Sequence, residues 1–145
     1  NFTSADFAKY HPGGALGKRL YLRASEMYVR HKRPQVYVDT KMIDLIVEMS
    51  SKRLGATAVL DKNEALVGVV TDGDLRRALA AGNDVMNLLA KDVMSKNPKT
   101  VAEDELAIRV LDKMQQHKIS QIIVVKAQQY MGMIHLHDLL QEGLL

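Results

Sequence analysis

The chain has no cysteine and no tryptophan, and it has only two phenylalanines among its 145 residues. Without cysteine it can form no disulfide, no thiolate metal site and no cysteine nucleophile, and such a composition suits a reducing cytoplasm. Few aromatic rings are available to stack on bases, and acidic residues are interleaved with basic ones around a net charge of +3. We therefore expect no nucleic-acid partner.

Long apolar runs are also missing. No segment approaches the length needed to span a bilayer, and no signal peptide is recognisable. With 47% hydrophobic and 26% charged residues, the composition is that of a globular protein. The first residue is Asn1 rather than Met, so we expect a fragment or a processed chain of a cytoplasmic protein with no membrane partner.

The most informative pattern is an internal repeat. The sequence GVVTDGDL at 68–75 is followed 64 residues later by GMIHLHDL at 132–139, and Pro34 and Pro98 have the same separation. A period of this length indicates two copies of one supersecondary unit, each too small to bury its apolar face alone. We expect the copies to dock and any functional site to lie in the cleft between them.

Each copy is predicted to run helix, strand, strand, helix. In the first copy, apolar residues at i, i+3, i+4 and i+7 predict a helix, two Val-rich strands at 56–60 and 65–71 predict a hairpin, and a second helical pattern stops near Gly82. The helical positions are Met42, Leu45, Ile46 and Met49, then Asp74, Leu75, Ala78 and Leu79.

The second copy repeats this order with a helix that turns Ala107, Val110, Leu111 and Met114 inward. Strands are predicted at 121–125 and 131–135, and a last helix from Asp138 to about Gly143. The fold class is therefore α/β in the mixed α+β sense, with two tandem units packed as a pseudo-twofold pair. We divide the chain into an arm at 1–23, repeat 1 at 24–82, and repeat 2 with its leading linker at 83–145.

The arm does not share the repeat. Its segment 11–19, HPGGALGKR, has the glycines and lysine of a phosphate loop, but Pro12 replaces the first glycine and Arg19 replaces the Ser or Thr. We interpret the glycines as a hinge. His11 is by itself only a weak indication of catalysis.

Thr71 and Asp74 form the sharpest local pair, and two interpretations stay open. They match a capping box, in which a hydroxyl and a carboxylate satisfy free N–H groups at a helix start. They also match a site in which the same groups hold ribose hydroxyls while the helix N-terminus attracts a phosphate. The corresponding pair in the second copy is His135 and Asp138, which lacks the hydroxyl.

Two further sets of polar residues lie near these pairs. Arg76 and Arg77 fall in the first turn of a helix, where the helix dipole disfavours cations, so they are either a solvated face or contacts to a bound phosphate. The basic run at 30–33 fits a solvated loop. His135, His137 and Asp138 offer two nitrogens and one oxygen with no further ligand in view, so we expect nucleotide-contacting or structural histidines and no metal site.

The two copies, ending in GVVTDGDL and GMIHLHDL, resemble a tandem pair of cystathionine β-synthase (CBS) domains over about residues 24–145. The resemblance implies a Bateman module, which binds adenosyl or other nucleotides and regulates an attached enzyme or channel. It assigns the ribose contacts of the family to Thr71 and Asp74. His135 departs from the pattern, which leaves only Asp138 at a second nucleotide site.

The arm, with DFAKYHPGGALGKRL at 6–20, together with TDGDLRR at 71–77, resembles the C-terminal half of bacterial D-arabinose 5-phosphate isomerases. That resemblance implies a missing upstream sugar isomerase domain, interconversion of ribulose 5-phosphate and arabinose 5-phosphate, and a role in Kdo, lipopolysaccharide or capsule biosynthesis. It makes His11 a candidate general acid or base whose partners lie in the missing domain.

These observations predict a non-catalytic regulatory module that requires no cofactor. The predicted ligand is a nucleotide or nucleotide sugar, either CMP-Kdo, the activated product of the pathway, or an adenine nucleotide. Its candidate contacts are Thr71, Asp74, Arg76, Arg77, His135, His137 and Asp138. The alternative is a module that only assembles the enzyme, because CBS pairs form homo-oligomers through their exposed helices.

Overall fold

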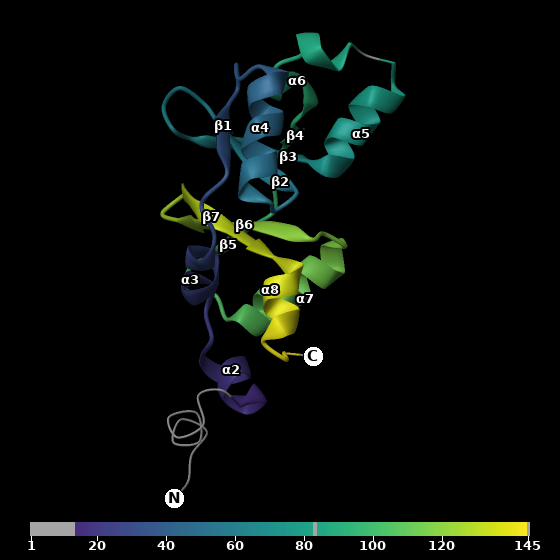
Figure 1. Ribbon diagram of the computed structural model, residues 1–145. Coiled ribbons are helices and arrows are strands. Elements are labelled where there is room, and N and C mark those ends of the chain that lie inside the picture. The colour runs from purple at the N-terminus through teal and green to yellow at the C-terminus, as the bar shows by residue number, and fades with distance from the viewer. Residues whose placement is uncertain (1–13, 83, 145) are drawn as a thin grey trace, which may run out of the picture.

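The computed structural model describes residues 14–82 and 84–144, apart from the side chain of Ala15. These residues form two stacked β-sheets, each with helices packed on it (Figure 1). One sheet has the strand order β1-β2-β3-β4 and the other the order β5-β6-β7. The mixed α and β architecture and the two-unit arrangement predicted from the repeat are confirmed.

The first copy supplies most of the four-stranded sheet. The predicted helix is α4 (Met42–Lys52), the hairpin is β2 (Ala56–Leu60) with β3 (Leu66–Thr71), and the closing helix is α5 (Asp72–Ala80). A short strand that was not predicted, β1 (Gln35–Tyr37), precedes α4 and pairs in parallel with β2. Three residues are too few to show a period-two pattern, which is why the sequence did not reveal it.

The second copy has the same plan. It comprises β5 (Thr100–Ala102), α7 (Ala107–His117), the hairpin of β6 (Gln121–Lys126) and β7 (Gln129–His135), and α8 (Leu136–Gln141). The hairpin register shifts at Val124/Val125, the position equivalent to the shift at Val59/Leu60 in the first copy. The last helix begins two residues before the predicted Asp138, because His135 is its N-cap residue.

The leading helices of the two copies are exchanged. Helix α3 (Ala24–Met27) and the 3₁₀ turn Tyr28–Arg30 come from the first copy but pack on the second, where the amide of Ala24 donates to the carbonyl of Glu105 (2.8 Å). The 3₁₀ turn Val85–Asn87 and helix α6 (Ala90–Val93) precede the second copy but pack on the first. Figure 1 shows α6 beside the sheet of β1–β4 and α3 beside the sheet of β5–β7. The division at residues 82 and 83 therefore follows the sequence repeat, while the packing crosses it.

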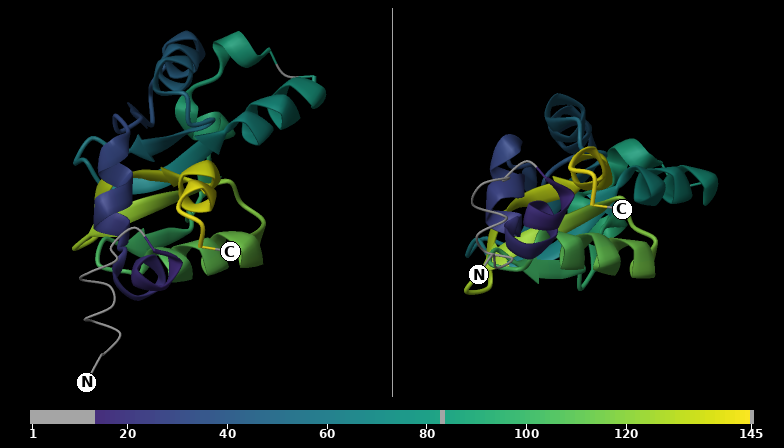
Figure 2. Two further views of the ribbon diagram at one scale, coloured as in Figure 1. Left: turned by 60° about the horizontal axis from the view of Figure 1, so that its bottom comes forward. Right: turned by 90° about the horizontal axis from the view of Figure 1, so that it is seen from below.

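Two elements have no counterpart in the other copy. Strand β4 (Ser95–Lys96) adds an antiparallel edge to β3, with Val69 opposite Ser95. Helix α2 (Ala15–Tyr21) packs against α7 (Figure 2, left). Its Lys18 forms a 2.8 Å ion pair with Glu142. The described part of the predicted arm is therefore a docked helix, while its first thirteen residues lie outside the described range.

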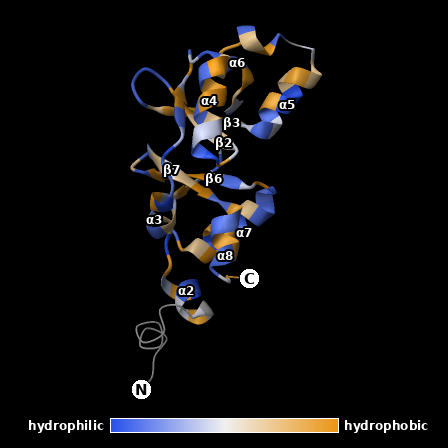
Figure 3. Ribbon diagram, viewed as in Figure 1, coloured by the Kyte–Doolittle hydropathy of each residue, from blue (hydrophilic) through white to orange (hydrophobic). Residues whose placement is uncertain are grey.

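Three apolar clusters hold the molecule together. One lies under the helices of each sheet, and the third lies between the sheets, where β2 meets β6 and β7. Figure 3 shows apolar segments in the strands and along the helices of both repeats. The predicted inward positions of α4 and α7 are buried, except that Ile46 is half-buried. Leu79, expected on the inner face of α5, is instead 62% exposed, because α5 buries Asp74 alone and its C-terminal end projects into solvent.

Candidate functional site

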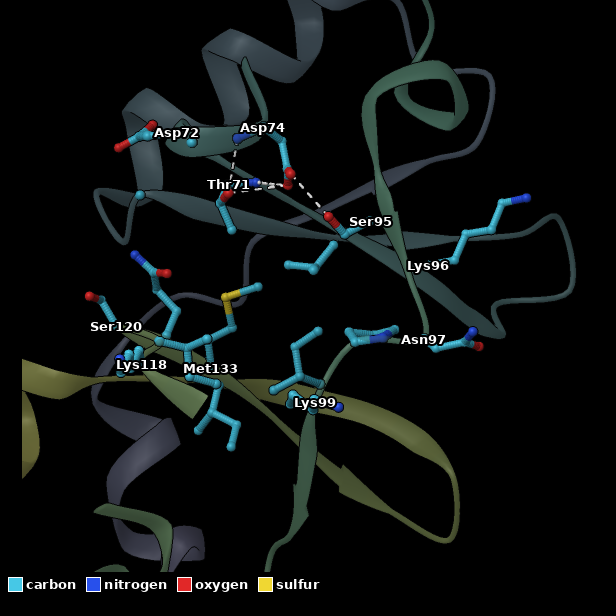
Figure 4. A pocket seen from close by; sticks show the side chains of 18 of the residues that line it. Thr71, Asp72, Asp74, Ser95, Lys96, Asn97, Lys99, Lys118, Ser120 and Met133 are labelled. Atoms are coloured by element: carbon cyan, nitrogen blue, oxygen red, sulfur yellow. Dashed lines mark hydrogen bonds between the residues drawn. The ribbon is translucent and has the colours of Figure 1, made fainter. Parts of the chain in front are cut away.

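A pocket of about 600 Å³ opens between the two repeats. One wall is the junction of β3 and α5, the second is the connection at residues 95–99, and the third is the start of β6 with the turn before it at 118–123. Figure 4 shows the side chains of Thr71 and Asp74 on one side and those of Lys118, Ser120 and Met133 across from them. The expected cleft between the copies is therefore present.

Thr71 and Asp74 form a complete capping box at the start of α5. The Thr71 hydroxyl accepts from the Asp74 amide (3.2 Å), and Asp74 Oδ2 accepts from the Thr71 amide (2.9 Å) and hydroxyl (3.1 Å). The capping interpretation of Thr71 and Asp74 is thus confirmed. The interpretation as a ribose-binding pair stays a prediction that is compatible with the cap, because both residues also line the pocket.

The other carboxylate oxygen of Asp74 binds two more donors. Arg77 Nη2 lies 2.6 Å from Asp74 Oδ1, and the hydroxyl of Ser95 lies 2.9 Å from the same atom. The Asp74 side chain is only 6% exposed, whereas that of Arg77 is 72% exposed. A polar group this buried is costly unless it is hydrogen-bonded, and these donors meet that need.

The pocket is lined by more cations than anions. Five basic side chains, those of Arg76, Arg77, Lys96, Lys99 and Lys118, line it against the two carboxylates of Asp72 and Asp74. The N-terminus of α5 adds a partial positive charge at the same wall. An excess of positive charge around a hollow favours a ligand that carries a phosphate or another anion.

The second copy builds a different cap. Asp138 Oδ2 accepts from the His135 amide (3.0 Å) and lies 2.7 Å from His31 Nε2, and His135 Nδ1 accepts from the His137 amide (3.0 Å). Burial lowers the pKa of His135, and the nearby His137 and His31 lower it further, against the opposing charge of Asp138. A neutral His135 therefore accepts a hydrogen bond from an amide at the start of α8, as the Thr71 hydroxyl does at the start of α5.

The structure separates the candidate residues into two groups. Thr71, Asp74, Arg76 and Arg77 line the pocket, whereas His135, His137 and Asp138 do not. The pocket therefore gathers four of the seven candidate residues, because its facing wall comes from the turn before β6 instead of the start of α8. A ligand contact at the other three stays a prediction. His11 lies outside the described residues.

Several pocket residues were missed by sequence reasoning, among them Ser95, Asn97, Lys118 and Gln121. A signal for Ser95 was available, because it stands 64 residues after His31, and both residues contact the cap carboxylate of a copy. Gln121 spans the two copies by donating to the carbonyl of Leu54 (2.9 Å). Such a contact depends on docking, which no repeat pattern specifies.

Neither a metal cluster nor a membrane-spanning helix occurs among the described residues. Within residues 14–82 and 84–144, no cluster of three or more His, Cys, Asp or Glu side chains is arranged to hold a metal ion. Over the same residues, no helix has both the length and the apolar character to cross a membrane.

The stacked sheets, exchanged leading helices and inter-repeat pocket define a module of two tandem repeats, and the family comparison agrees. The model of the CBS domain matches residues 24–81 and 90–144. The chain therefore belongs to the CBS domain family.

Among curated proteins, the chain is similar to the arabinose 5-phosphate isomerase KdsD of Pseudomonas aeruginosa, with 44% identity over 99% of this chain. It is 39% identical to KdsD of Escherichia coli over 98% of this chain. It spans only 45% and 44% of the lengths of these two relatives.

Two solved structures share the fold. The CBS domain protein PAE2072 from Pyrobaculum aerophilum, complexed with AMP, has 22% identity and a TM-score of 0.72, and the match covers 81% of this chain and 89% of that one. The CBS domain pair of protein MJ0100, in complex with 5-methylthioadenosine and S-adenosyl-L-methionine, has 21% identity and a TM-score of 0.73, covering 83% of this chain and 94% of that one.

Proposed function

We propose that the pocket between the repeats binds a nucleotide or a nucleotide sugar, and that its occupancy regulates an attached enzyme. One observation carries the proposal: a hydroxyl and a buried carboxylate, Thr71 and Asp74, lie in a hollow lined by five cationic side chains. A carboxylate can accept from two ribose hydroxyls, and the cations and the α5 N-terminus can bind the phosphate.

The volume of the pocket and the ligands of two structurally similar proteins support the same ligand class. A volume of about 600 Å³ falls within the range of small-molecule sites. Two proteins of the same fold were solved with adenosine compounds, AMP in one case and 5-methylthioadenosine with S-adenosyl-L-methionine in the other. These ligands make an adenine nucleotide one specific candidate.

The curated relatives suggest the attached enzyme. Because the chain matches less than half of each arabinose 5-phosphate isomerase, we propose that it belongs to an isomerase of that class acting in the cytoplasm. The catalytic domain would lie upstream, with His11 at its boundary as a candidate proton-transfer group. CMP-Kdo, the activated end product of such a pathway, is then the second specific ligand candidate.

Calorimetric titration of this chain with AMP, ATP, CMP and CMP-Kdo tests the proposal. We expect one of them to bind, and we expect Thr71→Ala with Asp74→Ala to weaken that binding at least about 10-fold, since hydrogen bonds to a charged group are lost. The matched control is His135→Ala with Asp138→Ala, which alters the cap outside the pocket and should leave the affinity unchanged. No heat and no shift in melting temperature with any of the four compounds would contradict the proposal.

A second candidate function is self-association. Helix α4 exposes Ile43 (52%) and Val47 (59%) one turn apart, whereas the equivalent positions of α7 are the half-buried Ile108 and the charged Asp112. We propose that this α4 face meets a second copy of the chain. Val47→Asp gives α4 the residue of α7 and should convert a dimer to a monomer in sedimentation experiments, while ligand binding is retained. A wild-type chain that is monomeric at all concentrations would exclude this function.

A further inference from the structure

The carboxylate of Asp74 has no acceptor site left. An ionised carboxylate has about four lone-pair sites. Oδ2 accepts from the amide and hydroxyl of Thr71, and Oδ1 accepts from Arg77 and Ser95. A ligand hydroxyl can therefore reach Asp74 only by replacing one of these donors.

The four donors differ in how readily they can leave. The Thr71 amide and hydroxyl belong to the cap, and removing them would leave a helix-start N–H without a partner. Arg77 holds Asp74 with a side chain that is 72% exposed, so an incoming phosphate can draw it away at little cost. Once Arg77 has left, a first ribose hydroxyl can take its site on Oδ1, and the second ribose hydroxyl competes with Ser95 for the remaining site on that oxygen.

Ser95 lies on the least secure strand of its sheet. Strand β4 is two residues long, both residues are exposed, and only two residue pairs join it to β3. Asn97 follows with a φ of 55°, a left-handed conformation that an L residue adopts at some cost. The side-chain hydrogen bond from Ser95 to Asp74 adds a further contact that fixes β4 beside the α5 cap (Figure 4).

Strand β4 lies in the segment that connects the two repeats, so the Ser95–Asp74 contact affects that connection. Residues 95–99 connect α6, which packs on the first repeat, to β5 of the second repeat, and they also form a wall of the pocket. A change at β4 therefore reaches both repeats. In the second copy, the equivalent His31 contacts Asp138, but β7 has no fourth strand beside it among the described residues.

We propose that Ser95 is a latch: its hydroxyl holds β4 against the Thr71–Asp74 cap, and a ligand hydroxyl that takes over Asp74 Oδ1 releases it. The ligand part of this inference rests on the proposed function. Ser95 is a positioning residue, and release of β4 is the means by which the filled pocket alters the connection between the repeats.

Two substitutions test the latch. Ser95→Ala removes the hydroxyl, and Ser95→Thr is the matched control that keeps it on a residue well suited to a strand. Without ligand, hydrogen exchange of the peptide that covers 94–99 should be about 2- to 10-fold faster in Ser95→Ala, the range for one net hydrogen bond, and unchanged in Ser95→Thr. With AMP, CMP or CMP-Kdo, Ser95→Ala should bind about 2- to 10-fold more tightly, because one competitor is gone.

The outcomes separate this inference from the proposed function. Unchanged exchange in Ser95→Ala overturns the latch, whatever the ligand data show. Faster exchange with equal or weaker binding in Ser95→Ala overturns competition at Oδ1 and makes Ser95 a structural or ligand-contacting residue. If no nucleotide binds to any variant, the proposed function fails and release by ligand fails with it, while the exchange data still decide whether Ser95 holds β4.

Discussion

Thr71 and His135 occupy the same place in the two repeats, 64 residues apart, and each precedes a helix whose third residue is an aspartate. Both aspartates accept a hydrogen bond from the amide of the cap residue. The remaining partners differ, since Asp74 contacts Arg77 and Ser95 whereas Asp138 contacts His31. The helix start imposes the shared part, because its N–H groups need acceptors in either repeat.

The residues that differ between the two caps are those that line the pocket in the first repeat. Positions 76 and 77 are arginines, and the positions 64 residues later are Leu140 and Gln141. The repeat whose cap lines the pocket has a hydroxyl and two cations there, and the other repeat lacks them. Both repeats thus have the carboxylate that a helix start needs, whereas the cap hydroxyl and the two arginines, which line the pocket, occur in the first repeat only.

The largest effect on stability is expected for a substitution that tests the exchange of the leading helices. Met27 is fully buried in the core of the second repeat, so Met27→Ala should lower the free energy of unfolding by about 2–5 kcal/mol. Hydrogen exchange should accelerate first in β6, β7 and α7, although Met27 belongs to the first copy in sequence. Met86→Ala, at a residue 54% exposed, is the control and should cost under about 0.5 kcal/mol. Acceleration confined to β2 and β3 would refute the exchanged packing.

The hydroxyl of the first cap should have a medium effect. Thr71→Ala removes an N-cap acceptor and should lower the free energy of unfolding by about 1 kcal/mol in urea titrations. The cost should be the same from pH 5.5 to 8, since a hydroxyl does not titrate there. Thr71→Ser keeps the hydroxyl and should stay close to the wild type. An equal loss in both variants would assign the stability to the methyl group.

Helix α2, present only on the second repeat, should depend on Glu142. This carboxylate lies 2.8 Å from Lys18 and 2.5 Å from Arg30, and the Lys18 ammonium group holds the pKa of Glu142 below its usual 4.5. A lowered carboxyl pKa stabilises the fold above about pH 4.5, and the contribution is lost as the pH falls. Glu142→Gln should cost less than about 1 kcal/mol and speed exchange in α2.

The control for this contact is Glu105→Gln, which removes the 4.0 Å contact of Glu105 to the largely exposed Arg109. It should leave both the stability and the exchange of α2 unchanged. If α2 exchanges at the same rate in Glu142→Gln as in the wild type, apolar packing on α7 alone holds this helix.

The smallest effect should be a pH dependence confined to the second cap. The pKa of His135 is below the ordinary 6.5, so the folded state binds fewer protons than the unfolded state, and stability is lost as the pH falls below about 6.5. Protonation also removes the acceptor at Nδ1 that binds the His137 amide. His135→Thr should therefore lose less stability than the wild type between pH 8 and pH 5.5, measured by urea midpoints. Identical losses would show that His135 does not titrate in this range with an effect on folding.

Much of the fold could be predicted from the sequence because it repeats strong local patterns. Apolar spacing placed α4 and α7, and the Val-rich segments placed both hairpins within a residue or two. Strands β1, β4 and β5 are only two or three residues long, and their formation depends on a neighbouring strand. Leu79 shows the limit of periodicity, since an apolar residue on a predicted inner face stays exposed when the helix extends past the core.

One wall of the candidate site could be predicted from the sequence, because its residues are close together in the chain. Thr71, Asp74, Arg76 and Arg77 follow one another around a strand-to-helix junction, so the sequence alone brings them together. Lys118 and Gln121 reach the pocket from the other repeat, and Ser95 reaches it from the connection. Their approach depends on how two apolar sheet faces dock, which local pattern does not encode.

By itself, the sequence determined that this chain is a tandem repeat with one complete Thr–Asp cap and one altered cap, because capping chemistry and apolar spacing are local. Tertiary structure alone decided that the leading helices are exchanged, that the histidine cap lies outside the pocket, and that Ser95 closes on Asp74. The physical reason is that the burial of apolar surface depends on residues that are far apart in the sequence. Each core is completed by a leading helix from the other copy, and that packing determines which polar groups lie close enough to form hydrogen bonds.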